Sequence, residues 1–569
     1  MAEHDLVIRG GTIVDGSGGA MFEADVAVKG GSIVGIGAVS GAGAEEIDAR
    51  GQLVTPGFVD IHTHYDGQIT WENKLRPSSG HGVTTVLMGN CGVGFAPVRP
   101  NQHELLIRLM EGVEDIPGAV MAEGVPWNWE TFPDYLRAIE QRPSDIDFAA
   151  QLPHSPLRVF VMGERGAKDE PPTEGDLARM RSLTSEAILA GAFGVSTSRA
   201  LAHRMRDGEP APSVRTEETE LMALAGGLRD AGGGVFQLLW KTDAPGLSEF
   251  ELVKRLQVAS GRPISFTLAQ SRSNWRDVLA ELNDAVRQNV PIRGQIYPRP
   301  VGMLFGLDLS FNPFSLNPSY RAIADLPLDR KVAALRDPEM KRRLLAEQPD
   351  DPNPFLVWFV NKTEMVFALG DPPNYTPPIE DNLAAKAERA GRDYREFLYD
   401  ELLKDEGRAI LYSPQGNMDG GRLDNAMALV CEPGTLIGLG DGGAHYGTIC
   451  DASYPTYILT QGVRDAAPDR RLSLPDVVRK LSWANAEHMG MLDRGLVRTG
   501  FKADLNVIDF DRLHLHAPRV SRDLPANGRR LTQIADGYTA SIVSGQIVYR
   551  NGESTGALPG RLVRYRNAA

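Results

Sequence analysis

Short apolar runs alternate with amphipathic stretches through the middle of the chain. Between Thr173 and Gly191, apolar residues recur every three to four positions, which predicts a helix, and a β-like run follows it. The same order repeats, and we expect about eight such strands, at residues 54–61, 83–88, 148–152, 193–197, 235–240, 264–268, 290–297 and 435–440. This order is typical of a parallel sheet covered by helices. A count of eight favours a closed (β/α)₈ barrel of the TIM type over an open doubly wound sheet, and a ninth run at 409–412 has no place in it.

The two ends of the chain carry a different pattern. Residues 1–55 contain short runs in which apolar and polar positions alternate between glycine turns, and residues 500–569 repeat this style. Such runs are typical of β-hairpins with one buried face. We therefore predict a small β-sandwich domain composed of 1–55 and 500–569, with the barrel domain at 56–499 between them.

The strand–helix alternation fails between residues 303 and 408. This segment is rich in proline, asparagine, phenylalanine and tryptophan. Insertions on the loop side of an α/β barrel usually cover the active site, so we predict a lid at 303–408. An oligomerisation arm is the alternative, and a homo-oligomer stays open. Aromatic residues such as Phe305 and Phe359 either line an acyl pocket or, as we expect, pack the insertion onto the barrel.

Composition and charge narrow the class of protein. The 569 residues are 42% hydrophobic and 24% charged, which is typical of a globular chain and excludes wholesale disorder. The formal net charge of −14 argues against nucleic acid or an anionic membrane as a partner, so we expect a small-molecule substrate. We find no apolar run of about 18 residues and no leader-like start, and three cysteines cannot build a disulfide framework. These absences favour the cytoplasm.

Four residues at predicted strand ends have side chains that bind metal ions. His62 and His64 lie two positions apart after the first strand, so on an extended chain they point to the same side and can share a metal. Cys91 follows the second strand as a candidate thiolate ligand. Asp441 follows the eighth and is a candidate ligand, general base and general acid. The alternatives are polar histidines at a strand end, a buried inert cysteine and a turn aspartate.

These residues stand in motifs that resemble a known family. The segments VTPGFVDIHTHYDGQ, GDGGAH and KADLNVIDF are similar to the amidohydrolase superfamily, and GVTTVLMGNCGVGFAP, LPHSPLR and AFGVSTS resemble its N-acyl-D-amino-acid deacylase (D-aminoacylase) branch. The resemblance covers nearly the whole chain except 303–408. It implies a (β/α)₈ barrel, zinc and amide hydrolysis. It also implies His62, His64 and Cys91 as metal ligands and Asp441 as proton shuttle.

The chain departs from that branch at two metal ligands. The family places a histidine at the end of the fifth strand and another at the end of the sixth, but here these positions fall near Gln237 or Leu239 and on Leu268. The lysine of the sixth-strand motif becomes about Gln270. Leucine cannot coordinate zinc, and a glutamine amide matches it poorly. We therefore expect one tightly bound zinc ion per chain, held by the four residues named above.

Other histidines follow predicted strands. His154 comes after the third strand and could polarise the substrate carbonyl or join the metal, with a structural histidine as the alternative. His445 lies four residues past Asp441 and could orient it or the substrate. His203 lies in a polar loop after the fourth strand, where it could reach the barrel mouth, although we expect solvent exposure.

The carboxylate of an N-acyl amino acid calls for a cation in the site. Arg299, next to Tyr297 at the seventh strand end, is our candidate, and both are predicted to contact substrate. Other cations near strand ends are Arg199, Lys241 and Arg272.

These residues predict a hydrolase of a linear amide bond, most simply of an N-acyl amino acid, that uses zinc-activated water with Asp441 moving the proton. A hydrolase of a cyclic amide, carbamate or lactone is the alternative within enzymes. A catalytically decayed barrel that binds a small molecule is the alternative from another class, motivated by the two missing histidines.

Overall fold

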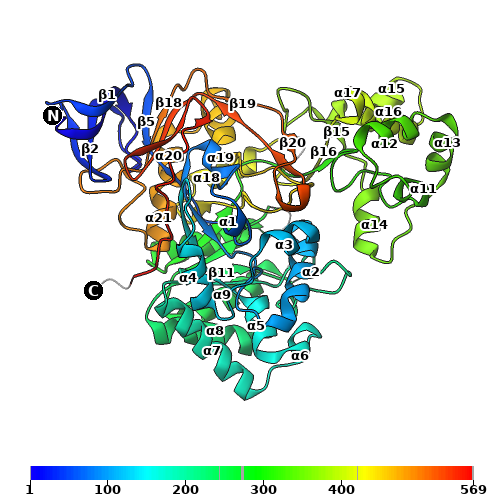
Figure 1. The fold of residues 1–569 in the computed structure, drawn as a ribbon, viewed down its shortest axis with the longest axis horizontal. Coiled ribbons are helices and arrows are strands. Elements are labelled where there is room, and N and C mark those ends of the chain that lie inside the picture. The colour runs from blue at the N-terminus through cyan, green and yellow to red at the C-terminus, as the bar shows by residue number, and fades with distance from the viewer. Residues whose placement is uncertain (1, 242–243, 271–274, 419–420, 567–569) are drawn as a thin grey trace.

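The computed structural model describes residues 2–241, 244–270, 275–418 and 421–566. Figure 1 shows a central body of strands and helices with an appendage on either side. Strands β1 (His4–Ile13) and β2 (Phe22–Lys29) belong to the appendage on one side, and a helical lobe stands on the other. The central body carries the predicted metal ligands.

Parallel strands form the core of this body. One sheet runs in the order β17–β13–β12–β11–β10–β9, and every neighbouring pair in it is parallel. A second parallel sheet contains β6, β7 and β8. The strands are β6 (Phe58–Asp60), β7 (Val83–Met88), β8 (Asp147–Ala150), β9 (Leu152–Pro153), β10 (Gly194–Ser198), β11 (Val235–Leu239), β12 (Ile264–Thr267), β13 (Ile292–Ile296) and β17 (Thr435–Ile437). Each predicted run overlaps one of them, so the predicted α/β order is confirmed.

The two parallel sheets adjoin at both edges. Along the chain, only Gln151 separates β8 from β9, and its backbone N–H donates to Met88 O at 2.9 Å. Beyond β6 and β17, Thr63 and Gly442 form a parallel bridge. The loops after β6, β7 and β17 therefore come together at the carboxyl ends of the strands, where parallel α/β folds carry their ligand sites.

Helices follow the strands and cover the sheets. They include α2 (His103–Glu114), α4 (Phe132–Glu140), α5 (His154–Met162), α7 (Glu174–Leu189), α8 (Glu218–Ala231), α9 (Gly246–Ser260), α10 (Trp275–Arg287), α18 (Asp424–Cys431), α20 (Leu474–Leu481) and α21 (Trp483–Met489). At the start of α7, the Thr173 side chain accepts from the N–H of Asp176, while Met180 and Leu183 are buried. Such a cap stabilises a helix by about 1 kcal/mol. The helix predicted between Thr173 and Gly191 is confirmed.

Both ends of the chain contribute to one nine-stranded sheet. Its path runs β25–β24–β23–β18–β5–β1–β2–β3, and β4 pairs with β1. The remaining strands are β3 (Ser32–Gly37), β4 (Gly43–Asp48), β5 (Leu53–Pro56), β18 (Leu505–Ile508), β23 (Tyr538–Val543), β24 (Gln546–Arg550) and β25 (Glu553–Ser554). Val54 lies opposite Val507 in the antiparallel pair that joins the two ends. The domain bounds 1–55, 56–499 and 500–569 stay a prediction.

The helical lobe is formed by the predicted insertion, 303–408. Its helices are α11 (Pro318–Arg321), α12 (Leu328–Leu335), α13 (Pro338–Ala346), α14 (Pro354–Asn361), α15 (Leu383–Arg389), α16 (Tyr394–Leu402) and α17 (Lys404–Gly407). The antiparallel strands β14 (Val301–Phe305), β16 (Leu411–Gly416) and β15 (Phe367–Ala368) adjoin it, and β16 accounts for the run at 409–412. Phe305 and Phe359 belong to the lobe's own apolar core, with ring centroids 5.3 Å apart. These rings pack the lobe itself, and a role as a lid stays a prediction.

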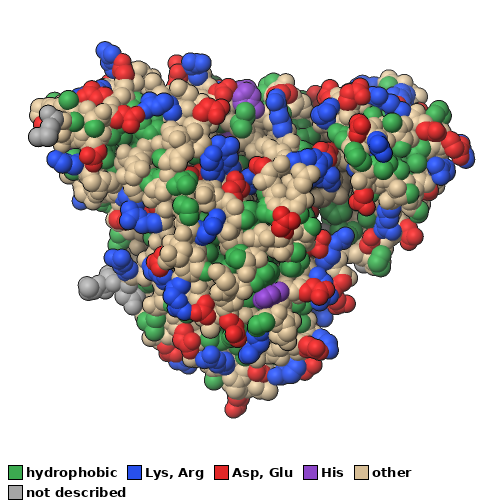
Figure 2. All heavy atoms as spheres, viewed as in Figure 1, with side chains coloured by type: hydrophobic (Ala, Val, Ile, Leu, Met, Phe, Trp, Pro, Cys, Tyr) green, Lys and Arg blue, Asp and Glu red, His purple; other side chains and the backbone are tan. Residues whose placement is uncertain are grey.

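Charge is spread over the molecular surface. Figure 2 shows acidic and basic side chains intermixed over the face that it draws, so the excess negative charge is not gathered into one patch there. Within the described ranges, every helix is too short or too polar to span a bilayer.

Candidate metal centre

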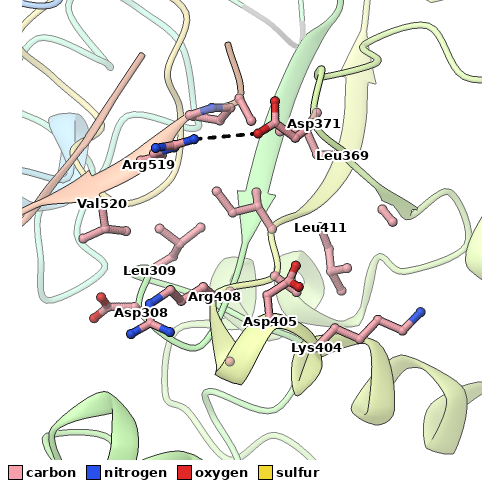
Figure 3. A pocket seen from close by; sticks show the side chains of 18 of the residues that line it. Asp308, Leu309, Leu369, Asp371, Lys404, Asp405, Arg408, Leu411, Arg519 and Val520 are labelled. Atoms are coloured by element: carbon pink, nitrogen blue, oxygen red, sulfur yellow. Dashed lines mark ion pairs between the residues drawn. The ribbon is translucent and has the colours of Figure 1, made fainter. Parts of the chain in front are cut away.

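The described residues surround several hollows. One, of about 950 Å³, lies beside α12 and has neither a histidine nor a cysteine in its described lining. Another, of about 670 Å³, lies between the helical lobe and β20 (Arg519–Ser521), where Arg519 faces Asp371 at 3.8 Å (Figure 3). Among the described residues that line it there is neither a histidine nor a cysteine. A smaller cavity, of about 230 Å³, is lined by all four predicted metal ligands, namely His62, His64, Cys91 and Asp441.

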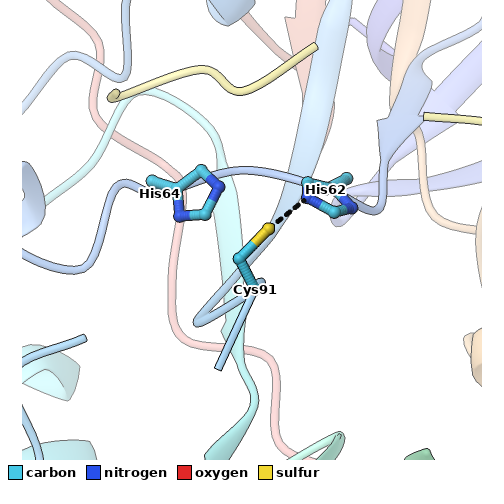
Figure 4. Close-up of side chains that lie close together, drawn as sticks. All are labelled: His62, His64 and Cys91. Atoms are coloured by element: carbon cyan, nitrogen blue, oxygen red, sulfur yellow. Dashed lines mark hydrogen bonds between the residues drawn. The ribbon is translucent and has the colours of Figure 1, made fainter. Parts of the chain in front are cut away.

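The ligand atoms of these residues converge on one point. Ring nitrogens of His62 and His64 and the Cys91 sulfur lie within 4.8 Å of one another (Figure 4). His62 Nε2 is 3.3 Å from Cys91 Sγ and 3.4 Å from Asp441 Oδ1, and His64 Nε2 is 3.6 Å from the same oxygen. Asp441 Oδ1 is buried with no hydrogen-bond partner among the described residues. Imidazole, thiolate and carboxylate are the donors that zinc prefers, so these residues fit one zinc ion.

An oxygen atom lies next to Nδ1 of both histidines. Gln295 Oε1 lies 2.7 Å from Nδ1 of His62, and Glu114 Oε1 lies 3.4 Å from Nδ1 of His64. Each ring therefore turns its Nε2 toward Cys91 and Asp441. In metal sites the nitrogen of a histidine that is not a ligand usually meets such an acceptor, which fixes the tautomer.

The backbone around the cluster is strained. Cys91 has a φ of 54°, Leu439 of 63°, Asp441 of 48° and His445 of 54°, all in the left-handed region. A residue other than glycine in this region costs of order 1–3 kcal/mol, and such residues gather at functional sites. A side chain would clash with Tyr454 at Gly440 and with Ser78 at Gly442, so glycine is required on both sides of Asp441.

Burial and neighbouring charges set the protonation of the metal-free cluster. Burial lowers the pKa of His62 to about 4, so this ring is neutral at pH 7. Burial likewise raises the pKa of the Cys91 thiol to about 12. Burial alone would raise the pKa of Asp441, but His64, whose Nε2 lies 3.6 Å from Oδ1, and the neighbouring His62 and His445 outweigh it and hold the pKa well below its usual range. Burial alone would lower the pKa of His64, but the charge of Glu114 outweighs it and raises that pKa well above its usual value. A metal ion must therefore displace a proton from both Cys91 and His64, whereas Asp441 is already ionised.

Glu114 and His445 extend the cluster toward the cavity. His445 Nε2 lies 3.6 Å from Glu114 Oε2 and 3.8 Å from Asp441 Oδ2, and its backbone N–H donates to Glu114 O at 2.5 Å. Both residues line the cavity. Burial raises the pKa of Glu114 to about 7, while His64 opposes that rise. Glu114 was not predicted as a site residue, because its only signal in the sequence is an acidic residue on the last turn of an amphipathic helix.

Tyr297 and Arg299, both predicted to contact substrate, lie in different surroundings. Tyr297 lines the cavity, and its hydroxyl donates to Asp451 O at 3.1 Å. Arg299 is only 2% exposed and is ion-paired with Asp451, and its guanidinium lies 3.9 Å above the ring of Tyr375. Its charge is already balanced and it does not line the cavity, so the prediction of a carboxylate-binding Arg299 requires correction.

His154 also requires correction. Its Nδ1 lies 2.8 Å from Thr197 Oγ1 and its Nε2 lies 2.8 Å from Glu220 Oε1, while Arg158 pairs with the other oxygen of Glu220. Both ring nitrogens are thus engaged in a buried network, and His154 is not among the residues that line the cavity. This is the structural alternative for His154 rather than a ligand or a carbonyl-polarising group.

His203 is less exposed than expected. It is half-buried and lines the cavity, and its buried Nδ1 has no hydrogen-bond partner among the described residues. Burial lowers the pKa of His203 to about 3. Leu239 and Leu268 also line the cavity, with aliphatic side chains where the resemblance leads one to look for histidines. Gln237 lies deeper on β11 and is buried.

The remaining cationic candidates do not join the described cavity wall. Arg199 forms a buried ion pair with Glu249 at 2.8 Å, and the backbone N–H of Lys241 donates to the same carboxylate at 3.0 Å. Arg272 lies outside the described residues.

Comparison with known proteins adds to this geometry. A model of the amidohydrolase family matches residues 45–549. The chain is 28% identical to an N-acyl-D-aspartate deacylase of Alcaligenes xylosoxydans xylosoxydans, over 99% of this chain and 95% of that protein. It is 38% identical to a D-aminoacylase of the same organism, over 34% of this chain and 37% of that protein.

Solved structures share the fold. A crystal structure of D-aminoacylase has a TM-score of 0.64 at 21% identity and covers 99% of this chain and 100% of its own. An N-acyl-D-glutamate deacylase from Bordetella bronchiseptica, complexed with zinc and a phosphonate inhibitor, gives 0.64 at 22% identity with the same coverage. Another D-aminoacylase structure is described with a binuclear metal centre.

Proposed function

The chain belongs to the amidohydrolase family, and from this premise we propose that it hydrolyses the amide bond of N-acyl amino acids with the aid of zinc. The observation that carries this proposal is the convergence of His62, His64 and Cys91 within 4.8 Å, with Asp441 beside them. The named relatives, which are deacylases of N-acyl-D-amino acids, support the substrate class and the D configuration.

We also propose that the two parallel sheets form one closed (β/α)₈ barrel. The single residue between β8 and β9 and the bridge between Thr63 and Gly442 support closure at both edges. In such a barrel the loops at the carboxyl ends of the strands carry the active site, and the loops with His64, Cys91 and Asp441 occupy that position in this proposal.

The three free cysteines support a cytoplasmic location.

One zinc ion fits the donors of this chain. His62 Nε2, His64 Nε2, Cys91 Sγ and Asp441 Oδ1 would hold it. Aliphatic Leu239 and Leu268 in the cavity wall support a single site. When bound, zinc supplies Lewis acidity that activates water and polarises an acyl carbonyl.

Asp441 is the proton carrier in this proposal. Its Oδ1 faces the two histidines, whereas Oδ2 lies 3.8 Å from His445 Nε2 on the cavity side. Its depressed pKa keeps it ionised before reaction, so Oδ2 can accept a proton from the attacking water and pass it to the leaving amine. His445 and Tyr297, which line the same cavity, orient the substrate.

Metal analysis combined with a substrate panel tests this function. We expect about one zinc per chain, lost in His62→Ala and Cys91→Ala but kept in a control, the exposed His514→Ala. In Asp441→Asn, kcat on N-acyl-D-amino acids should fall about 10²–10⁴-fold, because the proton carrier is gone. Two tightly held ions would contradict the single site and make His203 the first residue to test. A chain without metal, in which His62→Ala changes no hydrolysis, would contradict the enzyme and favour a binding protein.

A further inference from the structure

Glu114 occupies a fixed position behind the metal cluster. It is the last residue of α2 and is only 2% exposed. The next residue, Asp115, ends the helix in the left-handed region, and its carboxylate accepts from Ser310 Oγ, the Gly447 N–H and Thr448 Oγ1. These bonds tie the end of α2 to the loop that follows His445.

The two carboxylate oxygens of Glu114 face two different histidines. Oε1 lies 3.4 Å from His64 Nδ1, and Oε2 lies 3.6 Å from His445 Nε2. His64 Nδ1 has no hydrogen-bond partner among the described residues, and Glu114 Oε1 is a carboxylate oxygen within ion-pair distance of it. Apo sites often hold such contacts long and tighten them when the site is filled.

We propose that Glu114 is a positioning residue of the metal centre, which holds the proton of His64 on Nδ1 so that Nε2 is free to bind zinc. This rests on the proposed function, because it requires His64 to be a ligand. A carboxylate behind a ligand histidine fixes the ring tautomer and raises the basicity of the coordinating nitrogen. The partner of His62 Nδ1 is the neutral amide of Gln295, whereas the partner of His64 Nδ1 is the carboxylate of Glu114. Of these two partners, only Glu114 is a carboxylate.

The second oxygen gives Glu114 a link to the cavity. His445 is held by Oε2 and by its backbone N–H, which donates to Glu114 O at 2.5 Å. Loss of the carboxylate therefore frees the His445 ring as well as the His64 ring. We expect substrate binding to weaken together with zinc binding, although the side chain is not itself a zinc ligand.

Zinc affinity measured by competition with a chelating dye tests this role. We expect Glu114→Ala to weaken zinc binding about 10–100-fold. Glu114→Gln keeps an acceptor oxygen but loses the charge, so its affinity should lie between those of Glu114→Ala and the unmodified chain. The matched control is Glu104→Gln, which removes an exposed carboxylate from the same helix and should leave affinity unchanged. Unfolding midpoints of the metal-free variants separate a lost ligand geometry from a lost fold.

Failure of the positioning role and failure of the proposed function give different results. Wild-type zinc affinity in both Glu114 variants would overturn the positioning role and leave the proposed function intact. If Glu114→Ala does not fold, the Glu114→Gln variant decides, because it is nearly isosteric. A chain that binds zinc but cleaves no N-acyl amino acid would overturn the proposed substrate and leave the positioning role standing. Failure of the unmodified chain to bind zinc would overturn both.

Discussion

Gln295, on β13, places its Oε1 2.7 Å from Nδ1 of His62. The other end of the same amide donates from Nε2 to Ser265 Oγ at 2.9 Å. Since the amide nitrogen is engaged with serine, its oxygen faces the imidazole, and His62 must donate from Nδ1. The lone pair of His62 Nε2 is thereby directed at Cys91 and Asp441.

Gln295→Leu should weaken zinc binding about 10–100-fold, because the His62 tautomer is no longer fixed. The measurement is the same chelator competition, with cobalt absorption as a second signal of the ligand set. Gln288→Leu, at an exposed glutamine outside the cluster, is the matched control. Equal zinc affinity in the two variants would contradict the role of Gln295.

Protonation of Glu220 in acid should lower the free energy of unfolding. Burial alone would raise the pKa of Glu220, but the hydrogen bonds and charges of His154 and Arg158 outweigh it and lower the pKa below 4.5. A depressed folded-state pKa contributes stability that is complete above about pH 4.5 and is lost as pH falls through the folded value. In urea unfolding, Glu220→Gln should cost about 3–5 kcal/mol at pH 7 and progressively less below pH 4.5.

A control for this pair lies on the same helix. Glu218 pairs with Arg255 at the surface at 2.7 Å, and Glu218→Gln should cost less than about 1 kcal/mol. A similar cost for Glu218→Gln and Glu220→Gln, or no loss of the Glu220 effect in acid, would count against the buried network.

Local patterns predicted the strands and the metal cluster. His62 and His64 lie two positions apart just after β6, and the strand ends that carry Cys91 and Asp441 meet because parallel strands share one carboxyl edge. These residues needed only the strand order to be found together. The left-handed backbone conformation of Asp441 was not predicted, but the strand order was enough to place its carboxylate near the histidines.

Residues whose partners are distant in sequence were not predictable in this way. His154 is engaged by Thr197 and Glu220, which lie 43 and 66 residues away, and nothing local marks that network. Glu114 reaches the site from a helix end and not from a strand end. Arg299 is neutralised by Asp451, a partner that the strand order alone does not reveal.

Arg299→Met should destabilise the fold by about 3–5 kcal/mol, because it leaves Asp451 buried and unpaired. The double variant Arg299→Met with Asp451→Asn should lose less than the sum of the single changes, since the unpaired charge is then absent. Unfolding in urea measures both. A variant that keeps full stability but shows a raised KM for every N-acyl amino acid would instead restore Arg299 as a carboxylate-binding group.

The charge of the cavity wall predicts which amino acids the enzyme accepts. Three carboxylates, those of Glu114, Asp441 and Asp451, line it, and among its described residues there is no lysine or arginine. Apolar side chains supply much of the remaining wall, namely Val113, Leu239, Leu268, Val301, Leu439 and Ile449. The charges of Asp451 and Glu114 are met by Arg299 and His64, so a second carboxylate on the substrate would lose water there and find no free cationic partner in the described wall.

We therefore expect kcat/KM for N-acetyl derivatives of apolar D-amino acids, such as leucine and methionine, to exceed that for N-acetyl-D-aspartate by about tenfold or more. N-acetyl-D-asparagine is the matched control, since it keeps the shape of aspartate without its charge. If aspartate and asparagine derivatives are cleaved equally well, wall charge does not select the substrate. A clear preference for aspartate, the substrate named for one relative, would mean that a cation outside the described wall reaches the cavity.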